Sequence, residues 1–148
     1  MRGIKNILIG LGLFSTSCFA MSEQQAQQIL NNLIKVSKAS STKLKIKKDP
    51  SVNAECGYFD RIILTSGALA LNTNTVAFIL AHELAHKMLG HRGSTYSREY
   101  AADKLGVQLA TKAGYNMCQG IKILLTFKGG KTHAPGIDRY NRVVGVCK

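Results

Sequence analysis

The chain has 148 residues, which is enough for one domain but too few for two independent hydrophobic cores. Hydrophobic residues make up 45% of it, as in an ordinary globular protein, so wholesale disorder is excluded. Twenty Lys and Arg against eight Asp and Glu give a net charge of +12, which suits nucleic acid or a membrane surface without choosing between them.

The first twenty residues have the layout of a secretory signal peptide. Arg2 and Lys5 precede an apolar run, and small residues lead to Ala20, after which we expect cleavage. The uncharged stretch is shorter than the ~20 residues that cross a bilayer, so we do not expect it to span a membrane. We predict no membrane span in the mature chain either. A lipoprotein anchored through Cys18 is the second interpretation, since no large aliphatic residue stands three positions before that cysteine. We therefore predict an exported protein, periplasmic or secreted, with residues 21–148 as its single domain.

Cleavage after Ala20 removes two positive charges and lowers the net charge from +12 to +10. An oxidising compartment permits disulfides, and the mature chain keeps Cys56, Cys118 and Cys147. One internal pair forms at most, and the sequence does not select among the three possible pairings. No CxxC spacing is present, which disfavours a zinc site made of cysteines.

The first half of the mature chain is predicted to contain one helix and three short strands. Apolar residues recur at helical spacing over residues 22–38. Asp49-Pro50 marks a turn. The strands are indicated by alternation or by β-favouring residues, and they lie around Leu44 and Ile46, at residues 54–58 and at residues 61–65.

The second half is predicted to be mainly helical. One helix covers residues 72–89, with Thr73 or Asn74 as its N-cap. Pro135-Gly136 indicates an irregular C-terminal segment. Two further helices are expected from about Ser97 to Gly114 and from about Met117 to Phe127. Together these elements predict a small α+β domain in which helices dominate.

The most informative segment is His82-Glu83-Leu84-Ala85-His86. Positions i and i+4 share one face of a helix, so the two imidazoles can bind a single Zn²⁺. Glu83 lies about 100° round the helix, beside the metal, where its carboxylate can accept a proton from bound water. The rest of this helix is apolar, and polar groups on a buried helix are costly unless they are paired or bound to a metal. A solvated polar face therefore explains the segment poorly.

A catalytic zinc site needs a third protein ligand, and Glu99 and Asp103 are the best candidates. They again stand four residues apart on a predicted helix, so both face the same way. Glu99 can bind the metal while Asp103 accepts an N–H from a ligand histidine and orients its ring. The competing interpretation is a solvated acidic pair. His91 lies five residues after His86, off the ligand face, and we expect it to interact with the dipole at the helix end.

This pattern resembles the gluzincin metallopeptidases, and more narrowly the family of the CAAX-prenyl endoproteases, the membrane heat-shock endopeptidase and their periplasmic relatives. The resemblance covers roughly residues 50–142. It implies a minimal zincin-like (minigluzincin) domain with a short antiparallel or mixed sheet edge beside the metal helix, and one Zn²⁺ per chain. Besides the metal motif, it rests on residues 52–54, 62–69, 101–106, 113–115 and 132–135 and on Arg139.

The resemblance also implies a role for each site residue. Glu83 is the general base and later the general acid, and the zinc ligands are His82, His86 and Glu99. His133 and Arg139 approach the open side of the metal and stabilise the oxyanion, or His133 caps the zinc in a resting state. Two features depart from the family pattern. His133-Ala134-Pro135 stands where a His-Pro dipeptide is usual, and the spacing from His86 to Glu99 is short.

In that family the segment over residues 54–58 is the edge strand beside the metal cleft. A peptide substrate can add to such a strand in an extended conformation through main-chain hydrogen bonds. This binding mode recognises the main chain of a substrate more than its side chains, so it suits unfolded or misassembled proteins as substrates. The implied edge strand consists of Ala54, Glu55, Cys56, Gly57 and Tyr58.

The sequence thus predicts a zinc-dependent metalloendopeptidase that acts on exported proteins or peptides. One rival is a cationic module for anionic envelope polymers or nucleic acid, with the lysines of residues 35–48 as its footprint. Aromatic residues are only 7% with no Trp, and no stacking motif interleaves those lysines, so we expect no nucleic-acid partner. Another rival holds peptides around a zinc site that does not cleave them. The basic surplus suits association with an anionic membrane or envelope surface.

Overall fold

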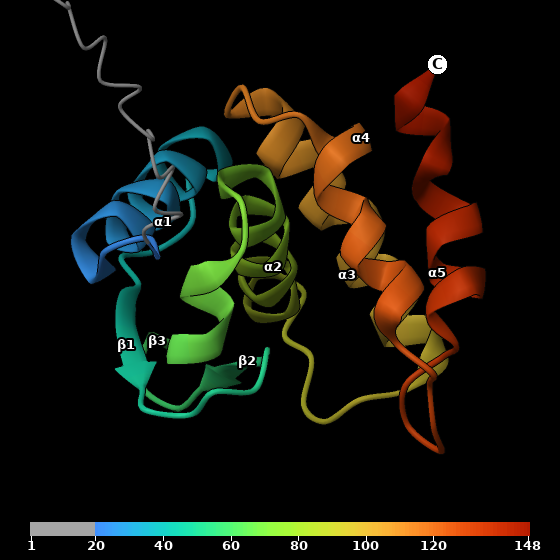
Figure 1. The fold of residues 1–148 in the computed structure, drawn as a ribbon, viewed down its shortest axis with the longest axis horizontal. Helices are drawn as coiled ribbons and strands as arrows, with labels where there is room; N and C mark the ends of the chain where they lie inside the picture. The colour runs from blue at the N-terminus through green and yellow to red at the C-terminus, as the bar shows by residue number, and fades with distance from the viewer. Residues whose placement is uncertain (1–19) are drawn as a thin grey trace, which may run out of the picture.

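The computed structural model describes residues 20–148, so the predicted signal peptide, Cys18 included, lies outside the described residues apart from Ala20. Helices dominate and a small sheet lies to one side, which confirms the predicted α+β class (Figure 1). The helices are α1 (Glu23–Ser37), α2 (Thr73–Met88), α3 (Tyr96–Lys112), α4 (Met117–Gly120) and α5 (Gly136–Val143). The strands are β1 (Lys43–Lys47), β2 (Ala54–Gly57) and β3 (Arg61–Thr65), and the 3₁₀ helices are η1 (Ser66–Ala70), η2 (Ile121–Thr126) and η3 (Val144–Cys147).

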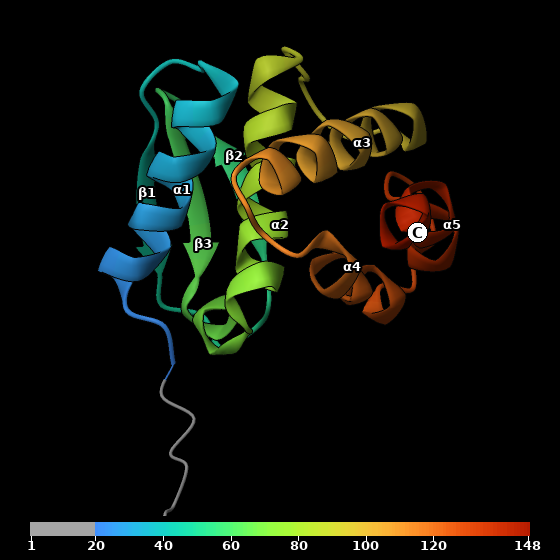
Figure 2. The ribbon, with the colours of Figure 1, turned by 90° about the horizontal axis from the view of Figure 1, so that it is seen from above.

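The sheet is mixed, as predicted, and has the order β1-β3-β2. β3 is the central strand, parallel to β1 and antiparallel to β2. Side chains alternate between the two faces of a strand, and in β3 the fully buried Ile62 and Leu64 lie on the face towards the helices. α1 lies across that face (Figure 2). β2, which leads into the cleft described below, therefore forms one edge of the sheet.

α2 runs through the centre of the molecule, and α3 packs closely against it (Figure 2). Three alanines on α2, at positions 77, 81 and 85, are fully buried and leave room for neighbouring elements. Gly106 on α3 completes the close approach, because a Cβ added there would lie 3.0 Å from His82 N. This tight crossing brings the side chains of both helices into one site.

Two predictions about helix ends are corrected by the structure. The N-cap of α2 is Asn72, not Thr73 or Asn74, because its side chain accepts a hydrogen bond from Thr75 N at 3.0 Å. The helix predicted from Met117 to Phe127 is α-helical only in its first four residues and then tightens into η2.

The C-terminal segment was predicted to be irregular, but it contains the helix α5. Pro135 stands directly before this helix, where its fixed φ and missing N–H do no harm. Gly136 is required at the first position because a Cβ there would lie 1.7 Å from Leu124 O. A Pro-Gly pair that usually ends a helix here begins one.

A disulfide between Cys118 and Cys147 ties η3 to α4, which selects one of the three possible pairings and leaves Cys56 free and exposed. The pair joins the segment that carries α5 to the helical core. Among residues 20–148, no helix is long and apolar enough to cross a membrane.

Candidate metal centre

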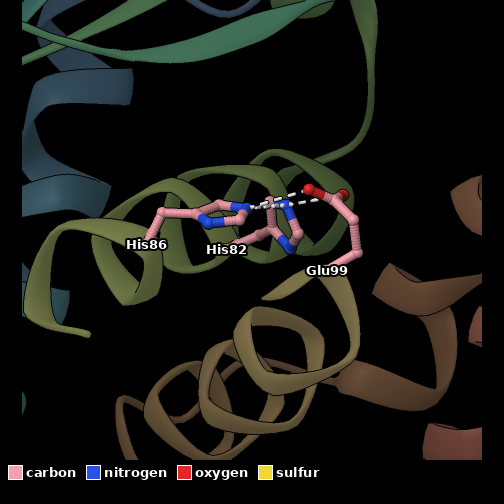
Figure 3. Close-up of side chains that lie close together, drawn as sticks. All are labelled: His82, His86 and Glu99. Atoms are coloured by element: carbon pink, nitrogen blue, oxygen red, sulfur yellow. Dashed lines mark hydrogen bonds and ion pairs between the residues drawn. The ribbon is translucent and has the colours of Figure 1, made fainter. Parts of the chain in front are cut away.

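Three predicted metal ligands come together between α2 and α3 (Figure 3). His82 Nε2 and His86 Nε2 lie 3.0 Å apart. The carboxylate of Glu99 faces both, with Oε2 3.6 Å from His82 Nε2 and Oε1 3.4 Å from His86 Nε2. A tetrahedral zinc ion with bonds of about 2.0–2.1 Å requires ligand atoms roughly 3.3 Å apart. The three distances bracket that value, so the donor set fits zinc.

The burial of these groups also favours a metal ion. His82 is 8% exposed and Glu99 only 2%. Polar groups at such depth are costly unless they are paired. Two imidazoles and one carboxylate are the protein ligands of one class of catalytic zinc site, in which the fourth position stays open for water or substrate.

Asp103 lies beside His82, the histidine next to which its carboxylate was predicted to lie. Its Oδ1 lies 2.9 Å from His82 Nδ1, but the two atoms are not aligned for a hydrogen bond, and this buried nitrogen has no other partner. Arg139 Nε and Nη2 each donate to the Asp103 carboxylate at 2.7 Å. Burial raises the pKa of Asp103, but Arg139 and His82 outweigh it and hold that pKa below its usual value. Asp103 is thus ionised, fixed by Arg139 and placed to orient the His82 ring.

Glu99 is held in the ionised form as well. Burial raises its pKa, but the contacts from His86 and Ser94 outweigh this effect, so the pKa lies well below its usual range. Ser94 Oγ lies 2.5 Å from Glu99 Oε1 and 3.1 Å from Thr132 O, so its one proton can be donated to either, and the hydroxyl connects the loop before α3 to the loop before α5. An ionised carboxylate is the form that binds a metal ion.

Arg139 and His133, which were predicted to approach the open side of the metal, differ in how deeply they are buried. Arg139 is 6% exposed, and its guanidinium contacts Asp103 and, through Nη1 at 3.3 Å, Glu99 Oε2. Asp103 raises the pKa of Arg139 against the effect of burial, so this group is a permanent buried cation between two carboxylates. The side chain of His133 is 59% exposed, and its Nδ1 lies 3.4 Å from Glu99 Oε2, at the rim of the site.

His91 is a site residue whose contact the sequence did not predict. Its Nδ1 lies 2.9 Å from His86 Nδ1. The helix ends at Met88, and Gly90, with a φ of 64°, reverses the chain so that the His91 ring returns to the helix. Burial and the neighbouring His86 lower the pKa of His91, which favours the neutral ring that can accept an N–H from His86. The glycine before His91 was the available signal.

Replacing His91 with phenylalanine is expected to weaken zinc binding by about 10- to 100-fold, because His86 loses the acceptor that fixes its ring and tautomer. His91→Gln keeps a polar partner and should lose less. Competition with a zinc indicator measures the affinity, and Arg92→Gln, a neighbouring exposed position, is the matched control. An unchanged zinc affinity in His91→Phe, with an unchanged melting temperature of the zinc-free protein, would show that the contact positions nothing.

A cavity of about 410 Å³ opens beside the three ligands. Glu83, which is 9% exposed, contributes to its wall next to His82. Residues 52–54, which lead into β2, form another part of the wall. The rest of the lining is partly apolar (Phe78, Ile79, Ile123, Leu124 and Phe127) and partly polar (Glu99, Thr126, Lys128, His133 and Arg139). The cavity therefore joins the predicted general base to the beginning of the predicted edge strand.

The predicted edge strand is one residue too long. β2 ends at Gly57, and Tyr58 belongs to the turn that follows. Within the described residues, the side of β2 away from β3 has no paired strand, so its main-chain groups are available for an extended peptide.

The chain was compared with models of known families. The family model described as Peptidase family M48 matches residues 20–97, which is 78 of the 148 residues. The match contains His82, Glu83 and His86 but ends before Glu99, so the third ligand rests on the geometry above. A comparison with curated proteins finds no match.

Proposed function

The chain belongs to peptidase family M48, a family of zinc metallopeptidases, and we propose that it is a zinc-dependent endopeptidase that cleaves extended segments of exported proteins. One observation carries this proposal. His82, His86 and Glu99 meet at the separations of a tetrahedral zinc site, at the edge of a cavity that also contains Glu83.

Each step of peptide hydrolysis is assigned to a particular group. A bound zinc ion lowers the pKa of a water molecule and polarises the peptide carbonyl. Glu83 accepts the proton that the attacking water loses as its oxygen bonds to the carbonyl carbon. The same carboxylate then donates that proton to the amine nitrogen as the C–N bond breaks. His133, at the rim, is placed to donate an N–H to the oxyanion or to cover the site in a resting state.

The substrate class follows from the shape of the cleft. Residues 52–54 lie along the cavity and continue into the free edge of β2. A peptide added to that edge must be extended, and folded proteins rarely offer such a segment. Unfolded or misassembled proteins do, and they are the substrates we propose.

Export is proposed on two grounds. The N-terminal segment has the layout of a signal peptide. The disulfide between Cys118 and Cys147 suits a protein that works in an oxidising compartment. Together they support a periplasmic or secreted enzyme over a cytosolic one.

Removing zinc is expected to abolish cleavage of an unfolded substrate such as reduced casein, because the water loses the ion that lowers its pKa. Addition of one equivalent of zinc per chain to the stripped protein should restore the rate. Metal analysis and a cleavage time course measure both. His133→Ala belongs in the same series, since a covering His133 would hold the wild-type rate down.

Two results would contradict this proposal. Cleavage that survives complete removal of the metal would exclude zinc chemistry. Zinc-loaded wild type and His133→Ala that bind several unfolded substrates but leave all of them intact would identify a peptide-holding protein.

A further inference from the structure

The turn between β2 and β3, residues 58–60, presents two adjacent aromatic side chains to solvent. Tyr58 is 90% exposed and Phe59 is 94% exposed, and no other large hydrophobic side chain among residues 20–148 exceeds 52%. Isolated exposed apolar residues are ordinary, but two neighbouring aromatic rings at the tip of a turn mark a contact surface.

The backbone of Phe59 has a conformation that a bulky residue disfavours. Its φ of 59° lies in the left-handed region, and Asp60 follows with a φ of 56°, which an aspartate tolerates more easily. Two contacts fix the turn. Lys87 Nζ lies 2.6 Å from the Asp60 carboxylate, and Lys43 N donates to Asp60 O at 2.9 Å. A strained turn that is held this firmly, and that buries neither ring, points to a function for the exposed rings.

The sheet face next to this turn is basic. α1 covers one face of the sheet (Figure 2). Because side chains alternate along a strand, the exposed residues of β1 and β3 lie on the other face. The strand register places Lys43 beside Arg61, the first residue after the turn. Asp60 is paired with Lys87, Asp49 lies 3.9 Å from Lys47, and Glu55 is the exposed acid on β2. We refer to the exposed side chains of Lys43, Lys45, Lys47 and Arg61 as the basic face.

We propose that the Tyr58-Phe59 turn and the basic face together dock this protein on an anionic lipid bilayer. Aromatic side chains settle at the headgroup level of a membrane, and lysine and arginine side chains beside them are attracted to anionic lipids. The charge of the basic face is therefore complementary to that surface. The two rings stand together at a tip, whereas side chains that stack on a nucleic-acid strand alternate with cations along a groove.

This arrangement places the proposed active site near the membrane. β2 extends from Ala54, which lines the cavity, to Gly57, which stands directly before the turn. At about 3.4 Å per residue, the cavity wall is roughly 10 Å from the turn. Membrane docking itself does not depend on the proposed peptidase function. The consequence that substrates at the membrane surface are favoured does rest on it.

A tryptophan introduced at position 59 reports the docking directly, because the chain contains no other Trp. The emission of Phe59→Trp should shift to shorter wavelength with vesicles of phosphatidylcholine and phosphatidylglycerol, and much less with phosphatidylcholine alone. Leu125→Trp, at a 49% exposed position on η2, is the matched control and should not shift. Every variant is expressed with the native N-terminal residues 1–20. Mass spectrometry then verifies that all purified variants begin at the same residue.

Vesicle sedimentation then tests the two parts of the surface. Tyr58→Ser with Phe59→Ser should lower binding about tenfold. Lys43→Gln, Lys45→Gln and Lys47→Gln together should lower it on the order of 100-fold at low salt, from roughly fivefold for each charge. The control removes three exposed lysines elsewhere, Lys104, Lys112 and Lys122, and should have a much smaller effect. A zinc chelator should change none of these values, which separates this test from that of the peptidase function.

Three outcomes would overturn the proposal. Equal losses from the two lysine triples would show that only net charge attracts the protein to lipid. An unshifted emission of Phe59→Trp on vesicles that do bind the protein would show that the turn stays in water. Displacement of the protein from vesicles by a single-stranded oligonucleotide, with the same emission shift in Phe59→Trp, would assign the surface to nucleic acid instead.

Discussion

Replacing Glu83 with glutamine is expected to lower the rate of peptide hydrolysis by roughly 10²- to 10⁴-fold, the contribution of a general acid–base group. Glutamine has the shape of glutamate, but its amide cannot accept the proton of the attacking water. Glu83 lines the cavity and is not among the three ligands, so the variant should still bind one zinc ion per chain. Rates on casein or a quenched peptide, with metal content measured on the same samples, test both halves of this expectation.

Glu23→Gln is the matched control for this experiment. Glu23 is an exposed carboxylate in the first turn of α1, outside the cavity wall and the proposed substrate strand, so the variant should cleave at the wild-type rate. A Glu83→Gln protein that keeps the wild-type rate with zinc bound would remove Glu83 from the chemistry. A large loss of bound zinc in the same variant would instead mean that Glu83 helps to hold the metal.

The sequence predicted those parts of the fold that local patterns specify. α2 contains the His82–His86 segment in a long apolar helix, so the element and its ligand face were both predictable from spacing. The alternation of lysine with Leu44 and Ile46 likewise predicted β1. In each case the side chains that bury and those that stay exposed follow the period of the element itself.

α5 could not be predicted in the same way. It is eight residues long, too short for a convincing period, and it begins at a Pro-Gly pair that more often interrupts structure. What stabilises it lies far away in the sequence. Arg139 bonds to Asp103, 36 positions earlier, and the disulfide that follows the helix spans 29 positions. Contacts of this range are properties of the assembled fold.

His91 illustrates a different limit. Continuing α2 as a regular helix places position 91 off the ligand face. The helix stops at Met88, however, and Gly90 in the left-handed region turns the chain back to His86. A prediction from helical spacing is thus sound only as far as the helix extends, and the residues just after a helix end need the turn geometry.

The second large effect is expected from Arg139→Met, which should lower the free energy of unfolding by about 3–5 kcal/mol. Arg139 is buried and bonds to the Asp103 carboxylate through two nitrogens at 2.7 Å, while a third lies 3.3 Å from Glu99. Methionine fills similar volume but leaves two buried carboxylates without their cation. Arg142→Met, on the same helix and stacked at 3.8 Å on the ring of Tyr100, should cost much less.

Zinc makes this prediction sharper, because the ion would bind only one of the two acids that Arg139 contacts. A bound zinc ion neutralises Glu99 but not Asp103, so zinc should restore part of the stability lost in Arg139→Met and leave the rest missing. Arg139→Lys keeps the charge but not the two parallel bonds, and should lie between the variant and wild type. Denaturant unfolding with and without a chelator, under non-reducing conditions that keep the disulfide, measures each difference. A loss that zinc restores completely would mean that Arg139 serves Glu99 alone, and that Asp103 does not depend on it.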